Sequence, residues 1–127
     1  MKQIIISQNA PAPVGPYNKA VLANGVLYVS GQIALNPETG ELEMASIEVE
    51  THRVMKNLNA ILIENKMNFE HVVKCTVFVS DMGNYSKINA VYSEYFDELT
   101  APARALVEVA NLPKYVNVEI SCIAVES

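Results

Sequence analysis

Apolar residues recur with a helical period in two segments of the chain. In residues 46–67 they are spaced three, four and seven positions apart, at Ile47, Val54, Met55, Leu58, Ile61 and Leu62. Residues 84–99 carry a similar stripe, at Tyr85, Ile88, Val91, Tyr92, Tyr95, Phe96 and Leu99. This spacing predicts two amphipathic helices, and Ser46 is a suitable N-cap for the first of them.

Six shorter segments are rich in β-branched and other apolar residues, which predicts strands. They cover residues 4–7, 20–23, 26–33, 72–79, 103–109 and 116–125. Asn24-Gly25 predicts a tight hairpin turn, residues 36–40 a second turn, and the three prolines within residues 10–17 an ordered loop that delivers Tyr17. The order is βββαβαββ, so we expect a single α+β domain over residues 1–127, with two helices packed on one face of a six-stranded sheet.

Side chains alternate between the two faces of a strand, and this rule assigns faces in the last strands. The strand at 103–109 has Ala103, Ala105, Val107 and Val109 on one face and Arg104, Leu106 and Glu108 on the other. We expect the apolar face to pack against the helices, so that Arg104 and Glu119 share the other face. An antiparallel pairing of the last two strands, with Val109 opposite Val116, would bring the two backbones about 7–8 Å apart.

The face expected to carry Arg104 and Glu119 is too apolar to remain in water. It holds Phe78, Leu106, Ile123 and Val125, and two helices cannot cover both faces of six strands. A large exposed apolar surface marks a site of protein association, so we predict self-association through this face. Arg104 and Glu119 would then lie near or inside a subunit interface.

Arg104 is one of only two arginines in the chain, and its strand is otherwise mostly apolar. Two interpretations are open. Either Arg104 and Glu119 form a structural ion pair, because buried pairs can fix strand register, or the planar guanidinium binds the carboxylate of a ligand. In the second case Glu119 would transfer protons beside that ligand.

Two further positions are candidates for a site. Asn89 lies on the same helical face as Tyr85 and Tyr92, where an unpaired amide would cost about 1–3 kcal/mol, so it is either satisfied in the core or faces a pocket. Gly31 follows Ser30 inside a predicted strand. A glycine at such a position predicts a bulge or a close backbone approach.

Composition and charge narrow the classes of function. Half of the residues are hydrophobic, 18% are charged and the formal net charge is −5, which indicates a globular protein and disfavours binding to nucleic acid. No apolar run is long enough for a signal peptide or a membrane span, so we expect a cytoplasmic protein that binds no membrane. Cys75 and Cys122 are predicted core residues. Because the chain lacks a phosphate-binding glycine loop, a metal-spaced cluster and a nucleophile elbow, we expect no cofactor and no metal.

A set of motifs along nearly the whole chain resembles the RidA family, also called the YjgF family. The motifs are Gly15-Pro16-Tyr17, Val29-Ser30-Gly31-Gln32-Ile33, the turn at 36–40, Pro102-Ala103-Arg104 with Val107-Glu108-Val109, and Val118-Glu119-Ile120. The resemblance implies a chorismate-mutase-like α+β fold and a homotrimer with three pockets between subunits. It also implies a deaminase of metabolite damage control, which hydrolyses 2-imino acids (2-iminopropanoate, 2-iminobutanoate) or their enamine tautomers to 2-oxo acids and ammonia.

The resemblance also implies roles for individual residues. By position, Arg104 would bind the substrate carboxylate and Glu119 would act as acid and base. The other expected pocket residues are Tyr17, Ser30, Gly31, Asn89 and Leu106. Leu106 stands where many members carry a cysteine, so a thiol role is excluded, and we expect the larger, apolar leucine either to narrow the pocket or to shift the substrate range.

Two other classes of function stay open. A non-catalytic trimer could use the same pockets to bind a small carboxylate metabolite, and Leu106 is the feature that favours this alternative. A ribonuclease or translation inhibitor, an activity attributed to some relatives, is disfavoured by the acidic net charge and the lack of a basic surface.

Overall fold

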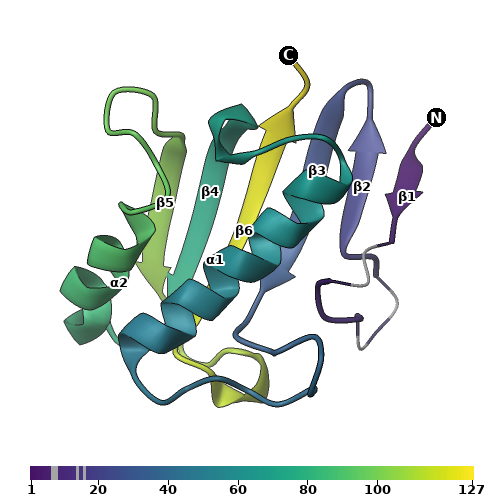
Figure 1. The fold of residues 1–127 in the computed structure, drawn as a ribbon. Coiled ribbons are helices and arrows are strands. Elements are labelled where there is room, and N and C mark those ends of the chain that lie inside the picture. The colour runs from purple at the N-terminus through teal and green to yellow at the C-terminus, as the bar shows by residue number, and fades with distance from the viewer. Residues whose placement is uncertain (7–8, 14, 16) are drawn as a thin grey trace.

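A computed structural model describes residues 1–6, 9–13, 15 and 17–127, and contains one six-stranded sheet with two helices on one face (Figure 1). The strands are β1 (Gln3–Ile5), β2 (Ala20–Ala23), β3 (Val26–Gln32), β4 (Val72–Val79), β5 (Ala103–Glu108) and β6 (Val118–Val125). The helices are α1 (Ile47–Glu64) and α2 (Tyr85–Tyr92), and short 3₁₀ turns lie at Phe69–His71, Met82–Asn84 and Pro113–Tyr115. The predicted order and the α+β class are confirmed.

The second helix is shorter than its apolar stripe predicts, because it ends at Tyr92 rather than near Leu99. The Ser93 hydroxyl donates to the Asn89 carbonyl oxygen at 2.7 Å, and the Asp97 carboxylate accepts from the Leu99 N–H at 2.9 Å. Such local side-chain bonds compete with the helical pattern and favour turns.

The hairpin turn between β2 and β3 is confirmed at Asn24-Gly25. Both residues have positive φ, 51° and 75°, as a two-residue turn of this kind requires, and Ala23 pairs with Val26 directly beside it. The predicted first strand extends to Ser7, which lies outside the described residues.

The prediction that the last two strands pair with each other is wrong. The strand order is β1-β2-β3-β6-β4-β5, so β4 lies between β5 and β6, and β5 is at the edge. β5 runs parallel to β4, with Arg104 opposite Cys75 and Leu106 opposite Val77. Parallel neighbours need a crossover connection, and α2 lies in the connection between β4 and β5 (Figure 1).

This pairing reverses the predicted faces of β5. Residues opposite each other in neighbouring strands point to the same side of the sheet, and Cys75 and Val77 are buried in the core beneath the helices. Arg104 and Leu106 therefore lie on the helix-covered face. The open face carries apolar side chains from four strands: Tyr28, Phe78, Ala103, Ala105, Val107, Ile123 and Val125.

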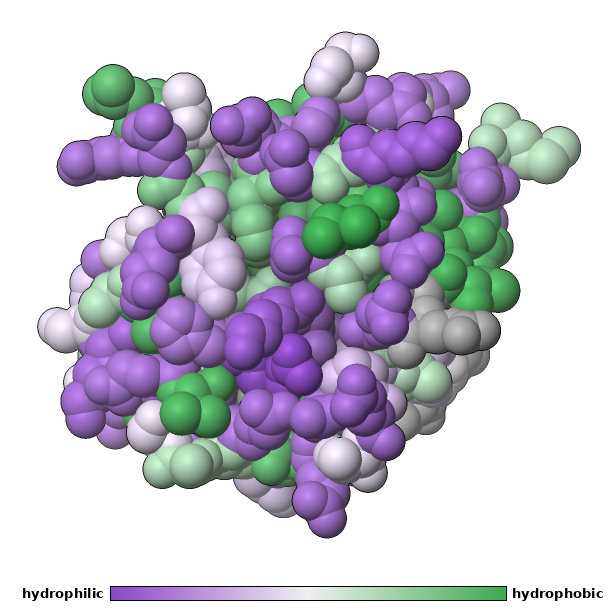
Figure 2. Space-filling view, viewed as in Figure 1, coloured by the Kyte–Doolittle hydropathy of each residue, from purple (hydrophilic) through white to green (hydrophobic). Residues whose placement is uncertain are grey.

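The two sides of the molecule therefore differ. The helix-covered side is mostly hydrophilic, with separate hydrophobic patches (Figure 2). On the open face, Tyr28 and Val107 are 49% and 47% exposed, so the apolar face predicted for self-association exists, with Val107 in place of Leu106. No helix in the described ranges is long and apolar enough to cross a membrane.

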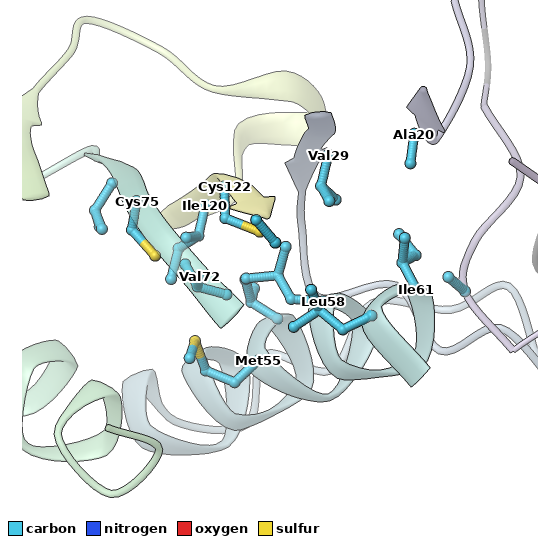
Figure 3. Close-up of a cluster of buried hydrophobic side chains, with 14 of the residues drawn as sticks. Ala20, Val29, Met55, Leu58, Ile61, Val72, Cys75, Ile120 and Cys122 are labelled. Atoms are coloured by element: carbon cyan, nitrogen blue, oxygen red, sulfur yellow. The ribbon is translucent and has the colours of Figure 1, made fainter. Parts of the chain in front are cut away.

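The hydrophobic core lies between α1 and the sheet. Met55, Leu58 and Ile61 of α1 point toward the strands (Figure 3) and are fully buried. Burying a side chain of this size contributes about 1.5–3 kcal/mol. Cys75 and Cys122 are confirmed as buried core residues, and they lie directly opposite each other on β4 and β6.

One acidic side chain is buried in this core as well. Glu50, in the first turn of α1, has 0% exposed surface. Its carboxyl oxygens accept from the backbone and side-chain N–H groups of Asn117, both at 2.8 Å, and from the Val118 N–H at 3.2 Å. These bonds tie α1 to the start of β6, immediately before Glu119.

Replacing Glu50 with glutamine is expected to lower the free energy of unfolding by about 2–3 kcal/mol. The new amide NH2 group would face N–H groups of the protein, and these buried donors would lose a carboxylate oxygen that now accepts their hydrogen bonds. Glu48→Gln is the matched control. Glu48 lies in the same helical turn but is exposed, so its change should cost less than about 0.5 kcal/mol. Chemical denaturation measures both variants, and equal stabilities would contradict the structural role of Glu50.

Candidate functional site

The guanidinium group of Arg104 is held by helix α2. One terminal nitrogen donates to the Asn89 side-chain oxygen at 2.9 Å, and the other donates to the Tyr85 hydroxyl at 3.1 Å. The Tyr92 ring faces the group, with its centroid 4.8 Å from Arg104 Cζ. Positions 85, 89 and 92 lie three or four residues apart, so the helix presents all three side chains on one face. We call these four residues the arginine group.

A hollow opens beside Arg104, and it is lined mainly by Asn89, Tyr92, Phe96, Glu98, Pro102 and Arg104. No acidic side chain in the described part of the chain forms an ion pair with Arg104. A guanidinium has five N–H donors, so its bonds to Asn89 and Tyr85 leave others free. A cation with uncharged partners beside a hollow is suited to bind an anion, above all a planar carboxylate.

Glu119 lies on β6, on the open face of the sheet, opposite Phe78 of β4. Its side chain passes directly over Gly31, where an added Cβ atom would come within 2.7 Å of Glu119 Cδ. The β3–β6 pairing shifts its register between Val29 and Gln32. The register shift agrees with the bulge predicted at Gly31, whereas the group that comes close is a side chain and not a backbone. Any larger residue at position 31 would displace Glu119.

Partial burial raises the pKa of Glu119 above its ordinary value. No other described residue forms a hydrogen bond or an ion pair with this carboxylate. Glu119 lines a pocket whose other walls are mainly apolar, and this pocket also contains Tyr17, Lys19, Gly31 and Pro113. A carboxyl group without a fixed partner and with a raised pKa is suited to take up and return a proton. We call Glu119, Tyr17 and Gly31 the glutamate group.

Ser30 supports the glutamate group but does not line its pocket. The Ser30 hydroxyl donates to the Asn18 carbonyl oxygen at 2.6 Å, and the Ser30 N–H donates to the Lys19 carbonyl oxygen at 2.8 Å. Ser30 therefore fixes the segment that directly follows Tyr17. A direct contact between Ser30 and a substrate stays a prediction.

Leu106 lies two residues beyond Arg104 on the same face of β5. It pairs with Val77 and packs partly against the core. Its side chain is not among the residues that line the hollow beside Arg104. The predicted contact between Leu106 and a substrate therefore also stays a prediction.

The arginine group and the glutamate group lie on opposite faces of the sheet. The prediction that Arg104 and Glu119 share a face is wrong for a single chain, because β4 separates their strands and Arg104 faces the helices. A structural ion pair between them within one chain is excluded. Arg104 instead joins β5 to α2 through Asn89 and Tyr85, and the binding of an external group by its remaining N–H donors stays a prediction.

Lys19 is a pocket residue that the sequence does not predict. Its amine is buried, which lowers its pKa, and Nζ donates to the Ala10 carbonyl oxygen at 2.6 Å. This bond ties the proline-rich loop to the strand that follows Tyr17. The sequence contains no signal for it, since a single lysine after a loop is ordinarily exposed.

The arginine group and the glutamate group together offer a cation, a carboxyl group and tyrosine hydroxyls. Within the described ranges, no group of three or more His, Cys, Asp or Glu side chains is placed to hold a metal ion. Arg104 can bind a carboxylate and Glu119 can move a proton. A reaction on a small carboxylate that needs proton transfer fits both functions.

Known proteins resemble the chain over nearly its whole length. A family model described as Endoribonuclease L-PSP matches residues 7–126. A RutC family protein of Synechocystis sp. is 54% identical, with 97% of this chain and 95% of that protein covered. The chloroplastic Reactive Intermediate Deaminase A of Arabidopsis thaliana is 37% identical, with 97% of this chain and 65% of that protein covered.

A solved structure with a bound ligand also resembles this chain. The crystal structure of E. coli TdcF with bound serine has a TM-score of 0.92 and 38% sequence identity. The similarity covers 98% of this chain and 99% of the TdcF chain. The six-stranded α+β fold is therefore shared with a protein that has been crystallised with an amino acid.

Proposed function

The chain belongs to the Endoribonuclease L-PSP family, which includes RutC and Rid proteins, and from this membership we propose that it hydrolyses reactive 2-imino acids to 2-oxo acids and ammonia. The proposed substrates are small, such as 2-iminopropanoate and 2-iminobutanoate or their enamine tautomers. Support comes from the deaminase among the relatives and from the chemistry of the arginine and glutamate groups.

In this proposal the substrate carboxylate binds to the free N–H donors of Arg104. Two parallel hydrogen bonds from a planar guanidinium to a planar carboxylate fix both position and orientation. Asn89 and Tyr85 already hold the two terminal nitrogens with one hydrogen bond each. The reacting carbon would thus be placed at a defined distance from the attacking water.

Glu119 acts as base and then as acid. It takes a proton from a water molecule while the water oxygen forms a bond to the carbon of the protonated imine, and the electron pair of the C=N double bond moves to nitrogen. Glu119 next returns the proton to this nitrogen, and the C–N bond breaks with its electron pair leaving on ammonia. As C=O forms, the hydroxyl gives its proton to Glu119, which passes it to the ammonia. The net reaction converts the iminium acid and water to a 2-oxo acid and ammonium.

A second copy of the chain completes the proposed site. One chain cannot bring Arg104 and Glu119 to the same substrate, because they lie on opposite faces of its sheet. We propose that one subunit supplies the arginine group and a neighbour supplies the glutamate group, with the apolar open faces buried between subunits. A closed ring of three copies would contain three equivalent sites.

The observation that carries this proposal is the half-buried Arg104, whose described partners are all uncharged and which lies beside a hollow. A desolvated cation without a counter-charge is costly unless an anion binds to it. The same observation suits a second candidate, a carboxylate-binding protein without catalysis, which the serine-bound TdcF structure also favours.

A coupled assay separates the two candidates. An amino acid oxidase generates the imine in place, semicarbazide competes for it, and an NADH-dependent dehydrogenase reports the 2-oxo acid. We expect the purified chain to increase the 2-oxo acid rate in proportion to its concentration. Calorimetric binding of 2-oxobutanoate without any increase in rate would support the binding protein instead, and the absence of both effects would reject both candidates.

A further inference from the structure

The ring of Tyr92 faces Arg104 but has no part in the chemistry proposed above. Arg104 Cζ lies 4.8 Å from the centroid of this ring and 5.8 Å from that of Tyr85. A cation within about 6 Å of a ring centroid is attracted to the face of the ring, and more strongly where water is excluded. Tyr92 is 6% exposed and Tyr85 is 37% exposed, so Tyr92 provides the shielded contact.

The ring of Tyr92 makes this contact, and the hydroxyl does not. The Tyr92 oxygen is buried near the Cys75 thiol and makes no hydrogen bond of ordinary geometry to any described residue. Burial raises the pKa of Tyr92 far above its ordinary value, so the phenol stays neutral. Removing the hydroxyl would therefore take away no bond on which Arg104 depends.

Packing fixes the orientation of the ring. Tyr92 lies against Phe96 with ring centroids 4.8 Å apart, and Phe96 lies edge-on to Phe69 at 5.2 Å. Tyr92 belongs to the buried core, whereas Asn89 is only partly buried and Tyr85 is exposed. Among the neighbours of the guanidinium, Tyr92 is thus the one with least freedom to move.

We propose that Tyr92 is a positioning residue that holds the plane of the Arg104 guanidinium, so that its free N–H groups face the hollow lined by both residues. Recognition of a carboxylate by a planar fork requires that this plane be fixed. Hydrogen bonds at the two terminal nitrogens leave a tilt about the line that joins them, and the buried Tyr92 ring, whose centroid lies 4.8 Å from Arg104 Cζ, limits this tilt. The kinetic test below rests on the proposed deaminase function, and the spectroscopic test does not.

The kinetic test compares Tyr92→Leu with Tyr92→Phe. For the leucine variant we expect KM for the imino acid to rise about 5- to 10-fold while kcat changes less than about twofold, because binding orientation and not proton transfer is affected. The phenylalanine variant retains the ring, and its KM should stay within about twofold of wild type. An equal rise in both variants, or an unchanged KM in the leucine variant, would overturn the proposal.

The spectroscopic test needs neither a substrate nor a folded leucine variant. The chain has only two arginines, so Arg53→Lys assigns the two guanidinium Nε–H resonances. We expect the Arg104 resonance to show an upfield ring-current shift in the wild type and in Tyr92→Phe. An unshifted Arg104 resonance would overturn the role of Tyr92. A shifted resonance in a protein without imine hydrolysis would reject the proposed function alone.

Discussion

Replacing Arg104 with alanine is expected to lower kcat/KM for imine hydrolysis by about 100- to 10,000-fold. A hydrogen bond to a charged group contributes about 1.5–3 kcal/mol, and the substrate carboxylate would lose two of them. Arg104 has no described acidic partner to leave unpaired, so the variant should keep the fold. The coupled imine assay and a thermal unfolding curve together measure the two effects.

Two further arginine variants sharpen this prediction. Arg53→Ala removes the other arginine of the chain, which lies at Glu43 and outside both groups, and it should keep wild-type activity. Arg104→Lys keeps the charge but cannot reproduce the planar fork, so its activity should stay well below wild type. Wild-type activity in Arg104→Ala would contradict the proposal that Arg104 binds the substrate carboxylate.

Replacing Glu119 with glutamine is expected to lower kcat by about 100- to 10,000-fold, the usual contribution of a general acid or base. Glutamine preserves the length of the side chain, so it should still fit over Gly31, where the available space is small. Glu70→Gln, a change at an exposed position on the short turn before β4, is the matched control and should retain activity. Unchanged kcat in Glu119→Gln would assign the proton transfer to another group.

The pH dependence of the reaction follows from the environment of Glu119. Burial raises the pKa of its carboxyl group, and a base must be ionised to accept a proton. The kcat/KM of the wild type should therefore fall as the pH drops through this raised pKa, above the value of about 4.3 of an exposed glutamate. The acid limb should disappear from the residual activity of Glu119→Gln.

Much of the fold can be predicted from the sequence, because the spacing of apolar residues and the residue types in turns are local properties of the chain. The order βββαβαββ, the hairpin at Asn24-Gly25 and the N-cap at Ser46 are all confirmed. The register shift beside Gly31 agrees with the predicted bulge for the same reason, since a glycine inside a strand commonly marks a bulge.

The arrangement of the last strands could not be predicted in the same way. Alternation separates the two faces of β5 but does not say which of them meets the helices. We expect the apolar face to pack inward, yet α2 supplies Asn89, Tyr85 and Tyr92 as partners for a charged residue, and Ala105 and Val107 remain on the open face. An apolar face that a second copy would cover cannot be distinguished from a core face by its pattern alone.

Only part of the candidate site can be predicted from the sequence, because the roles of some residues depend on distant contacts. Arg104 can be identified because arginine is rare in this chain and because its strand is otherwise mostly apolar. Glu50 and Tyr92 cannot, since an acidic residue in a first helical turn and an aromatic residue in an apolar stripe are both ordinary. Their roles depend on contacts with Asn117 and Arg104, which lie 67 and 12 positions away along the chain.

We propose that Arg104 of one subunit and Glu119 of another act on the same substrate, and a mixture of two inactive variants measures whether they do. Arg104→Ala and Glu119→Gln are unfolded together in equal amounts, refolded and assayed for imine hydrolysis. If each site takes one of these residues from each of two neighbours, random assembly restores about a quarter of the sites, and activity should return to about that fraction of wild type. Activity that stays at the level of the separate variants would contradict a site shared between subunits.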